Sequence, residues 1–514
     1  MKTIFFPVLL WVLALNAWGQ KKMSLPTKGE VIYHVSQRSF YDSNGDLHGD
    51  LNGLRQQLDY LQNLGVTSIL LLPLYEADCY HNYFANDFEK IDAEFGTMND
   101  YVSLVKAVHK RGMKIYLDME TQYVTAKHIW WKEAVGHPES AYSDYILFDD
   151  AAHNVPATMV FGLRELHSYN GTVIPITTVN LRSQQVLDYN IGLFSYFLDP
   201  NKDGKFDDGA DGFRLDHAMD NLDEKPALTN LFELFWKPLL VSLKKVNPNA
   251  KIVAEQANWK DYGFDYFEKA GVDRMFGFGL QQAILSFDKQ QLINKADTIL
   301  RLCPPGKEQL IFLENHDLDR FASLETNPRK QRVAAALQLL IGGIPSIYYG
   351  QELGMKGRIG AFGNTDGNDI PRREAFEWYQ SGEGKGMALW YKNTGGWWTQ
   401  SNIKANDGIS LDEQKRPANS LFNYYKTLIA LKQSNPALAN GRYENAPNDN
   451  PSVYSFRRIL GSDKVLIVAN LSNQVQKAKV PNQLKATRRL MGDARIEGKA
   501  IALKPYELGV WALK

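Results

Sequence analysis

Three short apolar runs in this chain each end in an acidic residue, and this pattern constrains the fold more than any other feature. Asp216 ends the run GFRLD, Glu255 ends IVAE, and Asp317 ends FLENHD. Short apolar runs bounded by turn residues are typical of strands that are buried on both faces of a parallel sheet. A carboxylate at the carboxyl end of such a strand lies where barrel enzymes place their chemistry. One such ending is often structural, but three of them, separated by helix-like segments, indicate a catalytic site.

Strand and helix signals alternate from about residue 31 to residue 438. Strands are expected at 31–36, 68–74 and 114–119 and around Phe213, Ile252, Met275, Leu310 and Ile347. Helices are expected at 51–64, 101–110, 228–246 and 331–340, the first of them ending at Gly65. Eight alternations predict an α/β protein with a (β/α)8 barrel. A doubly wound sheet is the structural alternative, but it usually has fewer strands.

Two stretches interrupt the alternation, and a third follows it. Residues 120–185 are irregular and rich in His, Tyr, Asn and Thr, which predicts an inserted domain between the barrel segments 20–119 and 186–438. Residues 353–415 form a loop rich in Gly and Trp after the eighth strand. In residues 439–514 the pattern changes to short strands, which predicts a C-terminal antiparallel β-sandwich.

The order of the motifs along the chain carries a resemblance to a known family. Upstream of the acidic runs lies GVTSILLLP at 65–73, and downstream lies GIPSIYYGQE at 343–352. Together with RLD at 214–216, Glu255 and NHD at 315–317, these motifs resemble the α-amylase family of glycoside hydrolases. The resemblance covers most of the chain. It implies a second domain, inserted after the third barrel strand, that forms one wall of the cleft.

The resemblance also implies a role for each acidic residue in cleaving a glycosidic bond, which passes through an oxocarbenium-like transition state. Asp216 would be the nucleophile, and Glu255 would protonate the leaving oxygen and then deprotonate the incoming water. Asp317 and His316 would hydrogen-bond ring hydroxyls more strongly in the transition state. Arg214 faces the same side of the strand as Asp216, and its guanidinium would keep that carboxylate ionised. Buried salt bridges that line a barrel mouth are the structural alternative.

Four further positions match the substrate-binding pattern of the family or depart from it. Asp118, at the end of the third strand, would support Arg214 and the nucleophile. Gln122 stands where the family has a calcium-ligating Asn, and Tyr123 stands where it has a His that contacts the primary hydroxyl of the sugar. Tyr123 would still donate a hydrogen bond there, from a different distance. Tyr83 matches the stacking tyrosine of the family, with an ordinary loop aromatic as the alternative.

Two loops have the spacing of oxygen ligands that a hard cation such as calcium requires. The first offers ligands at alternate positions: Asp42, Asn44, Asp46, His48 and Asp50. It resembles a calcium loop found in part of the family, in which position 48 contributes its backbone carbonyl. The second, at 199–203, has EF-hand-like spacing but lacks a Glu at the twelfth position. A cluster of Asx-turns is the alternative for both loops.

Composition narrows the choice of partners. The chain has 58 basic and 58 acidic residues, so its formal net charge is zero. This balance gives no reason to expect nucleic acid or an anionic membrane as a partner. A neutral, aromatic-rich chain is compatible with an uncharged ligand such as an α-linked glucan or oligosaccharide. Two free buried thiols are expected, because Cys79 and Cys303 are far apart in the sequence.

Residues 1–19 have the pattern of a secretory signal peptide. Lys2 is followed by an apolar run at 4–15 and by AWG at 17–19, so cleavage is expected before Gln20. The apolar run is short for a bilayer span, which favours export to the periplasm or the extracellular space over a membrane anchor. No later stretch approaches a transmembrane helix.

Three functions are compatible with these residues. The leading one is an exported, retaining α-glucoside hydrolase that works by double displacement. A transglycosylase or a glucosyl isomerase, such as a trehalose-forming enzyme, would use the same site, because these activities differ only in whether water or sugar reaches the intermediate. A non-catalytic relative that binds sugar or protein would usually lack one of the three carboxylates, and all three are present.

The preferred substrate is expected to be a short α-glucooligosaccharide rather than long starch. The loop at 42–50 resembles the branch of the family whose members mostly have pocket-shaped sites. The loop at 353–415 carries four tryptophans that would close one end of a groove: Trp378, Trp390, Trp397 and Trp398. Packing of these tryptophans on the barrel is the alternative.

Overall fold

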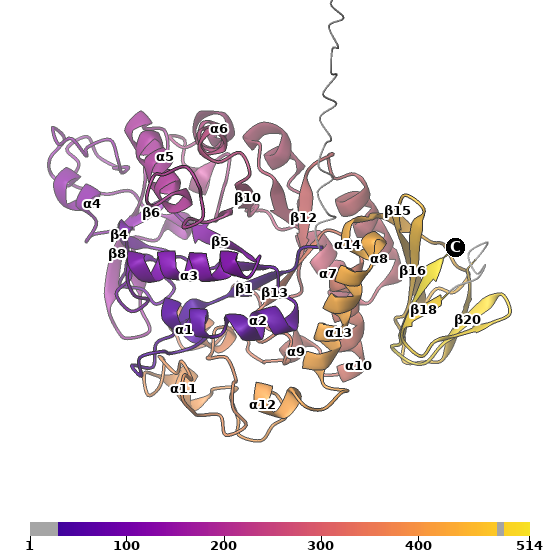
Figure 1. The fold of residues 1–514 in the computed structure, drawn as a ribbon. Coiled ribbons are helices and arrows are strands. Elements are labelled where there is room, and N and C mark those ends of the chain that lie inside the picture. Colours follow the sequence, from indigo (N-terminus) through magenta and orange to yellow (C-terminus); the bar gives the residue numbers. More distant parts are fainter. Residues whose placement is uncertain (1–28, 481–487, 514) are drawn as a thin grey trace, which may run out of the picture.

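The computed structural model describes residues 29–480 and 488–513, so the predicted signal peptide at 1–19 lies outside the described residues. Eight parallel strands close into a barrel, and helices surround it (Figure 1). In barrel order these strands are β1 (Ile32–Val35), β2 (Ser68–Leu71), β5 (Lys114–Met119), β9 (Gly212–Leu215), β10 (Lys251–Ala254), β11 (Arg274–Phe276), β12 (Glu308–Ile311) and β13 (Ile344–Tyr348). Every expected strand position falls in one of them, which confirms the predicted (β/α)8 barrel.

The main helices of the barrel layer alternate with these strands along the chain. They are α1 (Leu51–Gln56), α2 (Leu58–Leu64), α3 (Met98–Lys110), α5 (Gln184–Leu198), α6 (Lys237–Val246), α7 (Phe278–Ser286), α8 (Lys289–Ala296), α9 (Phe321–Leu324), α10 (Pro328–Leu340), α13 (Leu421–Ser434) and α14 (Pro436–Asn440). The helix expected at 51–64 is divided at Gln57, whose N–H donates to the carbonyls of both Gly53 and Leu54. Its end at Gly65 is confirmed, because this residue adopts the left-handed conformation with φ 101°.

The barrel strands are mostly apolar because both of their faces are buried. Phe213 of β9 faces Phe194 of α5, with the ring centroids 4.8 Å apart. Val253 of β10 belongs instead to a separate apolar cluster, formed by the inward side chains of several strands. Side chains alternate between the two faces of a strand. Arg214 and Asp216 therefore point to the opposite side from Phe213, toward the axis and the mouth of the barrel.

The inserted segment forms its own antiparallel elements, but its sheet also uses an earlier part of the chain. The five strands lie in the order β3 (Tyr75–Ala77), β4 (Ala85–Ile91), β6 (Tyr123–Thr125), β8 (Val173–Thr178) and β7 (Glu165–His167). One short helix, α4 (Ile129–Ala134), lies between β6 and β7 in the chain. Strands β3 and β4 follow the second barrel strand, so the sheet joins residues 75–91 to residues 123–178.

The loop after the eighth barrel strand holds the short helices η7 (Asp366–Arg372), α11 (Gly396–Thr399) and α12 (Leu411–Gln414). Trp378 is buried, and its indole N–H donates to the carbonyl of Phe40 at 2.6 Å. Trp390 is also buried, and its indole N–H donates to Ser39 Oγ at 2.9 Å. These tryptophans pack against the segment that follows β1 instead of closing a groove.

Two antiparallel sheets form the C-terminal part of the described chain, which confirms the predicted β-sandwich. One has the order β14 (Arg442–Asn445), β15 (Val453–Leu460), β16 (Asp463–Asn470), β21 (Leu508–Leu513) and β18 (Arg488–Met491). The other has the order β17 (Gln476–Lys479), β20 (Ala500–Leu503) and β19 (Arg495–Glu497). Val468, Ile501 and Trp511 are buried between the sheets.

Cys79 and Cys303 are both free thiols, as expected, although only Cys79 is fully buried. Within the described residues, no helix has the length and apolar character that a membrane crossing requires.

Candidate active site

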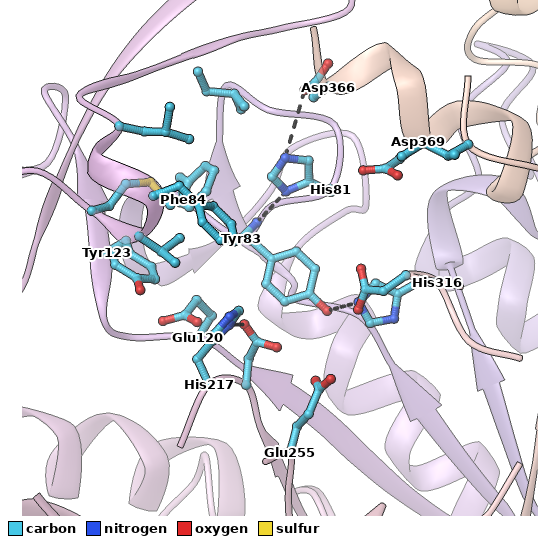
Figure 2. Close-up of a pocket in the computed structure, with 18 of the residues that line it drawn as sticks. His81, Tyr83, Phe84, Glu120, Tyr123, His217, Glu255, His316, Asp366 and Asp369 are labelled. Carbon is cyan, nitrogen blue, oxygen red and sulfur yellow. Dashed lines mark hydrogen bonds and ion pairs between the residues drawn. The ribbon is translucent and has the colours of Figure 1, made fainter. Parts of the chain in front are cut away.

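Side chains from neighbouring barrel strands meet at the carboxyl ends of those strands. Asp118 ends β5, Arg214 lies in β9, and Asp216 and Glu255 directly follow β9 and β10. A cavity of about 750 Å³ opens at this edge, and Asp216, Glu255 and Asp317 all line it. Figure 2 shows Glu255 and His316 among the side chains around this cavity. The three acidic residues that stand far apart in the sequence therefore belong to one pocket.

Arg214 is the centre of the charge network and is almost fully buried. Its Nη1 contacts both oxygens of Asp118, at 2.8 and 2.6 Å, and Oδ1 of Asp216 at 2.7 Å. Its Nη2 also contacts Glu255 Oε2. One guanidinium thus fixes three carboxyls, as expected for Asp118 and Asp216, and brings Glu255 beside the nucleophile candidate.

Asp216 and Glu255 differ in protonation although they share Arg214. Burial alone would raise the pKa of Asp216, but the charges of Arg214 and His217 hold it well below its usual range. Burial raises the pKa of Glu255 to about 8, helped by the charges of Asp216 and Asp317 and opposed by Arg214. Trp259 Nε1 donates to Glu255 Oε1 at 3.1 Å and orients the carboxyl. At neutral pH one group is therefore an anion and the other an acid.

Asp317 is held by charges on two sides. His316 Nε2 lies 3.0 Å from its Oδ2, and Arg373 Nη2 lies 3.2 Å from its Oδ1. Burial opposes ionisation, but His316 and Arg373 outweigh it and lower the pKa of Asp317 below its usual value. Arg373 also donates from Nε to the carbonyl of His316 at 2.9 Å. About one third of the Asp317 side chain remains exposed, so this carboxylate faces the pocket in ionised form.

Tyr83 and Tyr123 both line the pocket, but their hydroxyls are engaged in different ways. The Tyr83 hydroxyl donates to Asp118 Oδ2 at 2.7 Å, and its ring is stacked on His316 with centroids 5.5 Å apart. The Tyr123 hydroxyl donates to both oxygens of Asp223, at 2.9 and 2.8 Å. Both hydroxyls therefore bind a protein carboxylate, but only that of Tyr83 binds a carboxylate of the Arg214 network.

Gln122 supports the loop that follows β9. Its side-chain amide donates to the carbonyl of Asp216 at 2.6 Å and to the carbonyl of His217 at 3.1 Å. Its side chain is fully buried. Because its side-chain amide holds these two backbone carbonyls, Gln122 has a structural role.

Several residues of the site escaped the sequence analysis, among them Glu120, His217 and Arg373. Glu120 lies two residues after Asp118, and the two-residue repeat of a strand was the signal that could have placed it in the pocket. His217 follows the nucleophile candidate, and its Nδ1 lies 2.7 Å from Asp216 Oδ2. Its φ of 43° is unusual for a residue other than glycine and is typical of functional sites. Arg373 had no local signal, because it reaches the pocket from the long loop.

The pocket walls come from two segments that are distant in sequence. Residues 159–167 of the inserted segment and residues 359–373 of the loop after β13 both line the cavity, and Asp366 Oδ1 accepts the backbone N–H of Tyr169 at 2.5 Å. The four tryptophans of that loop do not line this cavity, which corrects the expectation that they close a groove. Trp378 and Trp390 pack against the segment that follows β1, and Trp397 packs against Phe362 and Tyr169, so smaller and polar residues of the loop face the pocket.

The loop at 42–50 is tightly folded by its own side chains. Asp42 accepts backbone N–H groups from Asn44, Gly45 and Leu47, at 3.0, 2.6 and 2.9 Å. Asp50 accepts from Ser43 and also caps α1 by accepting from Gly53 N at 2.7 Å. These contacts agree with an Asx-turn cluster. The loop nevertheless keeps an all-oxygen donor set, which is the chemistry that calcium requires.

The loop at 199–203 is also closed by Asx-type contacts. Asp199 Oδ2 accepts from Gly204 N at 2.8 Å, and Asn201 Oδ1 accepts from Asp203 N at 2.8 Å. A second calcium ion at this place stays a prediction.

The comparison with known proteins agrees with this geometry. The family model described as alpha amylase, catalytic domain, matches residues 34–229 and 248–441. The chain is 28% identical to Alpha-amylase 3 of Dictyoglomus thermophilum over 492 residues, which covers 93% of this chain and 92% of the relative. It is 28% identical over 509 residues to Trehalose synthase/amylase TreS of Mycobacterium tuberculosis, which covers 87% of this chain and 82% of the relative.

Among solved structures, an alpha-amylase from H. orenii matches with a TM-score of 0.79 and 27% identity, covering 95% of this chain and 100% of that one. The family model alone spans more than half of the sequence. The chain therefore belongs to the α-amylase family of glycoside hydrolases, and it is an enzyme that acts on α-glucosides.

Proposed function

We propose that this protein is a retaining α-glucoside hydrolase that cleaves short α-glucooligosaccharides by double displacement. The observation that carries the proposal is that Asp216 and Glu255 contact the same guanidinium, while only Asp216 has a second basic side chain, His217, at 2.7 Å. Arg214 and His217 keep Asp216 ionised, whereas burial keeps Glu255 protonated at neutral pH. A nucleophile must be ionised and a proton donor must be protonated at the same pH, and this pair meets both needs.

The reaction would proceed in two balanced steps. In the first, Asp216 attacks the anomeric carbon while Glu255 gives its proton to the leaving oxygen. In the second, Glu255, now ionised, takes a proton from the water that displaces Asp216 and restores both groups. Asp317, ionised and fixed by Arg373, would accept hydrogen bonds from ring hydroxyls as positive charge develops on the sugar.

The walls of the pocket support a short substrate. A cavity of about 750 Å³ lies within the usual range of about 300–1,000 Å³ for small-molecule sites. Residues 159–167 and 359–373 both line this cavity, and Asp366 Oδ1 accepts the backbone N–H of Tyr169 at 2.5 Å, so the two segments meet and would obstruct a long glucan there.

Chain-length preference is the test of the proposal. We expect kcat/KM on maltotriose-sized substrates to exceed kcat/KM per chain on amylose, with small sugars as the first products. Early products should be separated by size on a panel of α-linked oligosaccharides. Rapid internal cleavage of amylose, with a broad spread of early products, would contradict the pocket.

A second candidate is a glucosyl isomerase or transglycosylase of the trehalose-forming type. The pocket rim favours it, because Met159, Leu163 and Ile359 give the entrance an apolar character that would hold back water. The relative named Trehalose synthase/amylase TreS points the same way. Incubation with maltose separates the two candidates: glucose as the main product supports hydrolysis, and trehalose or longer glucosides support transfer.

A structural calcium ion at the loop 42–50 is part of the proposal. The side chains of Asp42, Asn44, Asp46 and Asp50 and the carbonyl of His48 would hold it. All of these donors are oxygen atoms, as a hard cation requires. The ion would tie the loop to α1 and would stabilise the fold without taking part in bond cleavage.

Export through the signal peptide at 1–19 completes the proposal. Its support is the order of a positive residue, an apolar run and small residues at the start of the chain. Expression of the full chain in a Gram-negative host, followed by fractionation, should give a periplasmic or extracellular protein that begins at Gln20. A full-length protein in the cytoplasm would contradict it.

A further inference from the structure

Glu120 is a buried carboxyl in the pocket that the reaction described above does not use. It directly follows β5 and is only 1% exposed. Its Oε1 accepts the backbone N–H of Gln122 at 2.6 Å, whereas its Oε2 has no hydrogen-bond donor among the described residues. Carboxylate oxygens of Glu120 and Asp216 and a ring nitrogen of His217 lie within 4.8 Å of one another, and Figure 2 shows Glu120 and His217 side by side.

Two carboxyls so close together in a buried site cannot both be ionised without a large electrostatic cost. The cations beside each carboxyl determine whether Glu120 or Asp216 remains protonated. Asp216 has Arg214 at 2.7 Å on one oxygen and His217 at 2.7 Å on the other. Glu120 has no ion-pair partner within the described part of the chain. The negative charge is therefore more stable on Asp216 than on Glu120.

We propose that Glu120 remains protonated and donates a hydrogen bond from its carboxyl to Asp216, and so acts as a positioning residue for the nucleophile. The proposal rests on the function proposed above, because it assigns that role to Asp216. The proton stays on Glu120 throughout the reaction. It stabilises the charge on Asp216 before attack and again when Asp216 departs from the sugar.

The groups that face Glu120 agree with this assignment. They come from four neighbouring segments: Tyr75, Asp118, Tyr123, Asp216 and His217. The Tyr75 hydroxyl donates to the backbone carbonyl of Glu120 at 2.6 Å, so it is not available to its carboxyl. Burial, with the charges of Asp216 and Asp118, raises the pKa of Glu120 well above its usual value.

A divalent cation shared by Glu120, Asp216 and His217 is the competing interpretation of this cluster. Such an ion would require both carboxyls to be ionised and the imidazole to be neutral. The charge of Asp216, partly opposed by burial, raises the pKa of His217 to about 9, so the imidazole is a cation at neutral pH. Arg214 adds a second positive charge beside Asp216. The proton on Glu120, the protonated imidazole of His217 and the guanidinium of Arg214 therefore already neutralise the two carboxyls of this cluster.

Two substitutions at Glu120 test the proposal, each assayed for kcat/KM at pH 6. Glu120→Gln keeps a neutral hydrogen-bond donor of the same shape, so it should retain activity within about threefold of wild type. Glu120→Ala removes the donor and should lose at least tenfold. Equal losses in both variants, or no loss in either, would overturn the proposal. Glu133→Gln, on the exposed face of α4, is the matched control and should behave as wild type.

The alkaline limb of the pH profile gives a readout that a purely structural role would not move. If Glu120 is neutral, Glu120→Gln leaves the charge beside Glu255 unchanged. The pH at the midpoint of the alkaline limb is then the same as in wild type. If Glu120 is ionised, its removal lowers the pKa of Glu255, and the midpoint moves down by up to about one unit. A downward shift therefore overturns the proposal.

Circular dichroism and Tm establish that each variant is folded. If Glu120→Gln is not, Glu120→Asp replaces it. That variant moves the donor back by one methylene, so a loss between those of wild type and Glu120→Ala is expected, with the midpoint unchanged. Activity equal to wild type, or a moved midpoint, would overturn the assignment. Wild-type protein that is inactive on every α-glucoside would instead refute the proposed function, so the two failures are distinguishable.

Discussion

Arg214 touches Asp118, Asp216 and Glu255, yet these carboxyls do not share one protonation state. The difference arises from the other neighbours of each group. Asp216 has a second cation in His217, whereas Glu255 has only the indole N–H of Trp259 in addition. Opposite pKa shifts in adjacent carboxyls are the usual mark of a nucleophile and its acid partner.

Replacing the nucleophile should separate chemistry from folding. In Asp216→Asn the neutral amide cannot attack the anomeric carbon, so turnover should fall by more than about 10⁴-fold, as for the loss of other covalent nucleophiles. The shape of the side chain is kept, so circular dichroism and Tm should remain close to those of wild type. Substantial residual turnover in a folded variant would show that another residue is the nucleophile.

The acid partner should control the alkaline side of the activity profile. Glu255 must be protonated to donate, so activity should fall as the pH rises through about 8. Glu255→Gln should lower kcat by about 10²–10⁴-fold on a natural glucoside. It should be much less impaired on α-glucosyl fluoride, whose leaving group needs no proton. An alkaline limb that is unchanged in Glu255→Gln would contradict this assignment.

The same pKa shift predicts an effect on stability. Between its usual pKa of 4.5 and the folded value of about 8, Glu255 binds a proton in the folded state and not in the unfolded state. Stability contributed by this group therefore falls as the pH rises through that window. Glu255→Gln removes the dependence, so its Tm relative to wild type should increase between pH 5 and pH 8. A constant difference in Tm would mean that burial does not hold the proton.

At the scale of elements, the loop 42–50 and α1 form one unit. Asp50 closes the loop by accepting from Ser43, and it caps α1 by accepting from Gly53. Asp46 contacts only loop residues, since Asn44 Nδ2 and His48 N donate to its carboxylate at 2.9 and 2.8 Å. A substitution at Asp46 therefore tests the loop without disturbing the N-cap of α1. A substitution at Asp50 would remove that cap.

Calcium dependence should show in thermal unfolding. An ion at about 100 times its dissociation constant stabilises the native state by about 2.7 kcal/mol, so chelator should lower Tm by several degrees. Asp46→Ala should have a lower Tm from the start and should lose the response to chelator. Activity at temperatures well below Tm should change little. The same chelator response in wild type and in the variant would contradict a calcium site at this loop.

At the scale of the whole molecule, one face of the larger C-terminal sheet packs into the apolar core of the barrel, whereas the core between the two C-terminal sheets is separate. Tyr443 and Phe456 belong to the same cluster as the barrel helices. Arg458 of β15 donates to the carbonyl of Leu340 in α10 at 2.9 Å, and it also bonds the carbonyl of Gly441. The sandwich therefore stabilises the helical layer on the side away from the sheet of the inserted segment (Figure 1).

This shared core predicts cooperative unfolding. Phe456→Ala should cost about 3–5 kcal/mol, as for other buried phenylalanines, and should lower the stability of the active site together with that of the sandwich. Loss of activity and loss of tryptophan fluorescence should then occur at the same denaturant concentration. Two separate transitions, with activity unaffected by the substitution, would show that the two domains are independent.

The sequence alone determined the barrel and its three carboxylates. Both depend on local pattern: strands buried on both faces are continuously apolar, and each acidic residue ends such a run. The C-terminal sandwich could also be predicted from the sequence, because its strands are short and separated by turns. Arg214 followed from its position two residues before Asp216, since the two-residue repeat of a strand fixes the direction of a side chain. Asp118 followed from the resemblance to the family.

Only the tertiary structure decided how distant segments combine. The sheet of the inserted segment recruits β3 and β4, and Arg373 reaches Asp317 from a loop 56 residues further along the chain. Trp378 and Trp390 of that loop pack against the segment that follows β1, because the core there offers them apolar partners. The proton on Glu120 depends on Asp216, 96 positions away in the sequence, and on the cations beside it. Protonation follows from the distances between charges, which the chain acquires only when it folds.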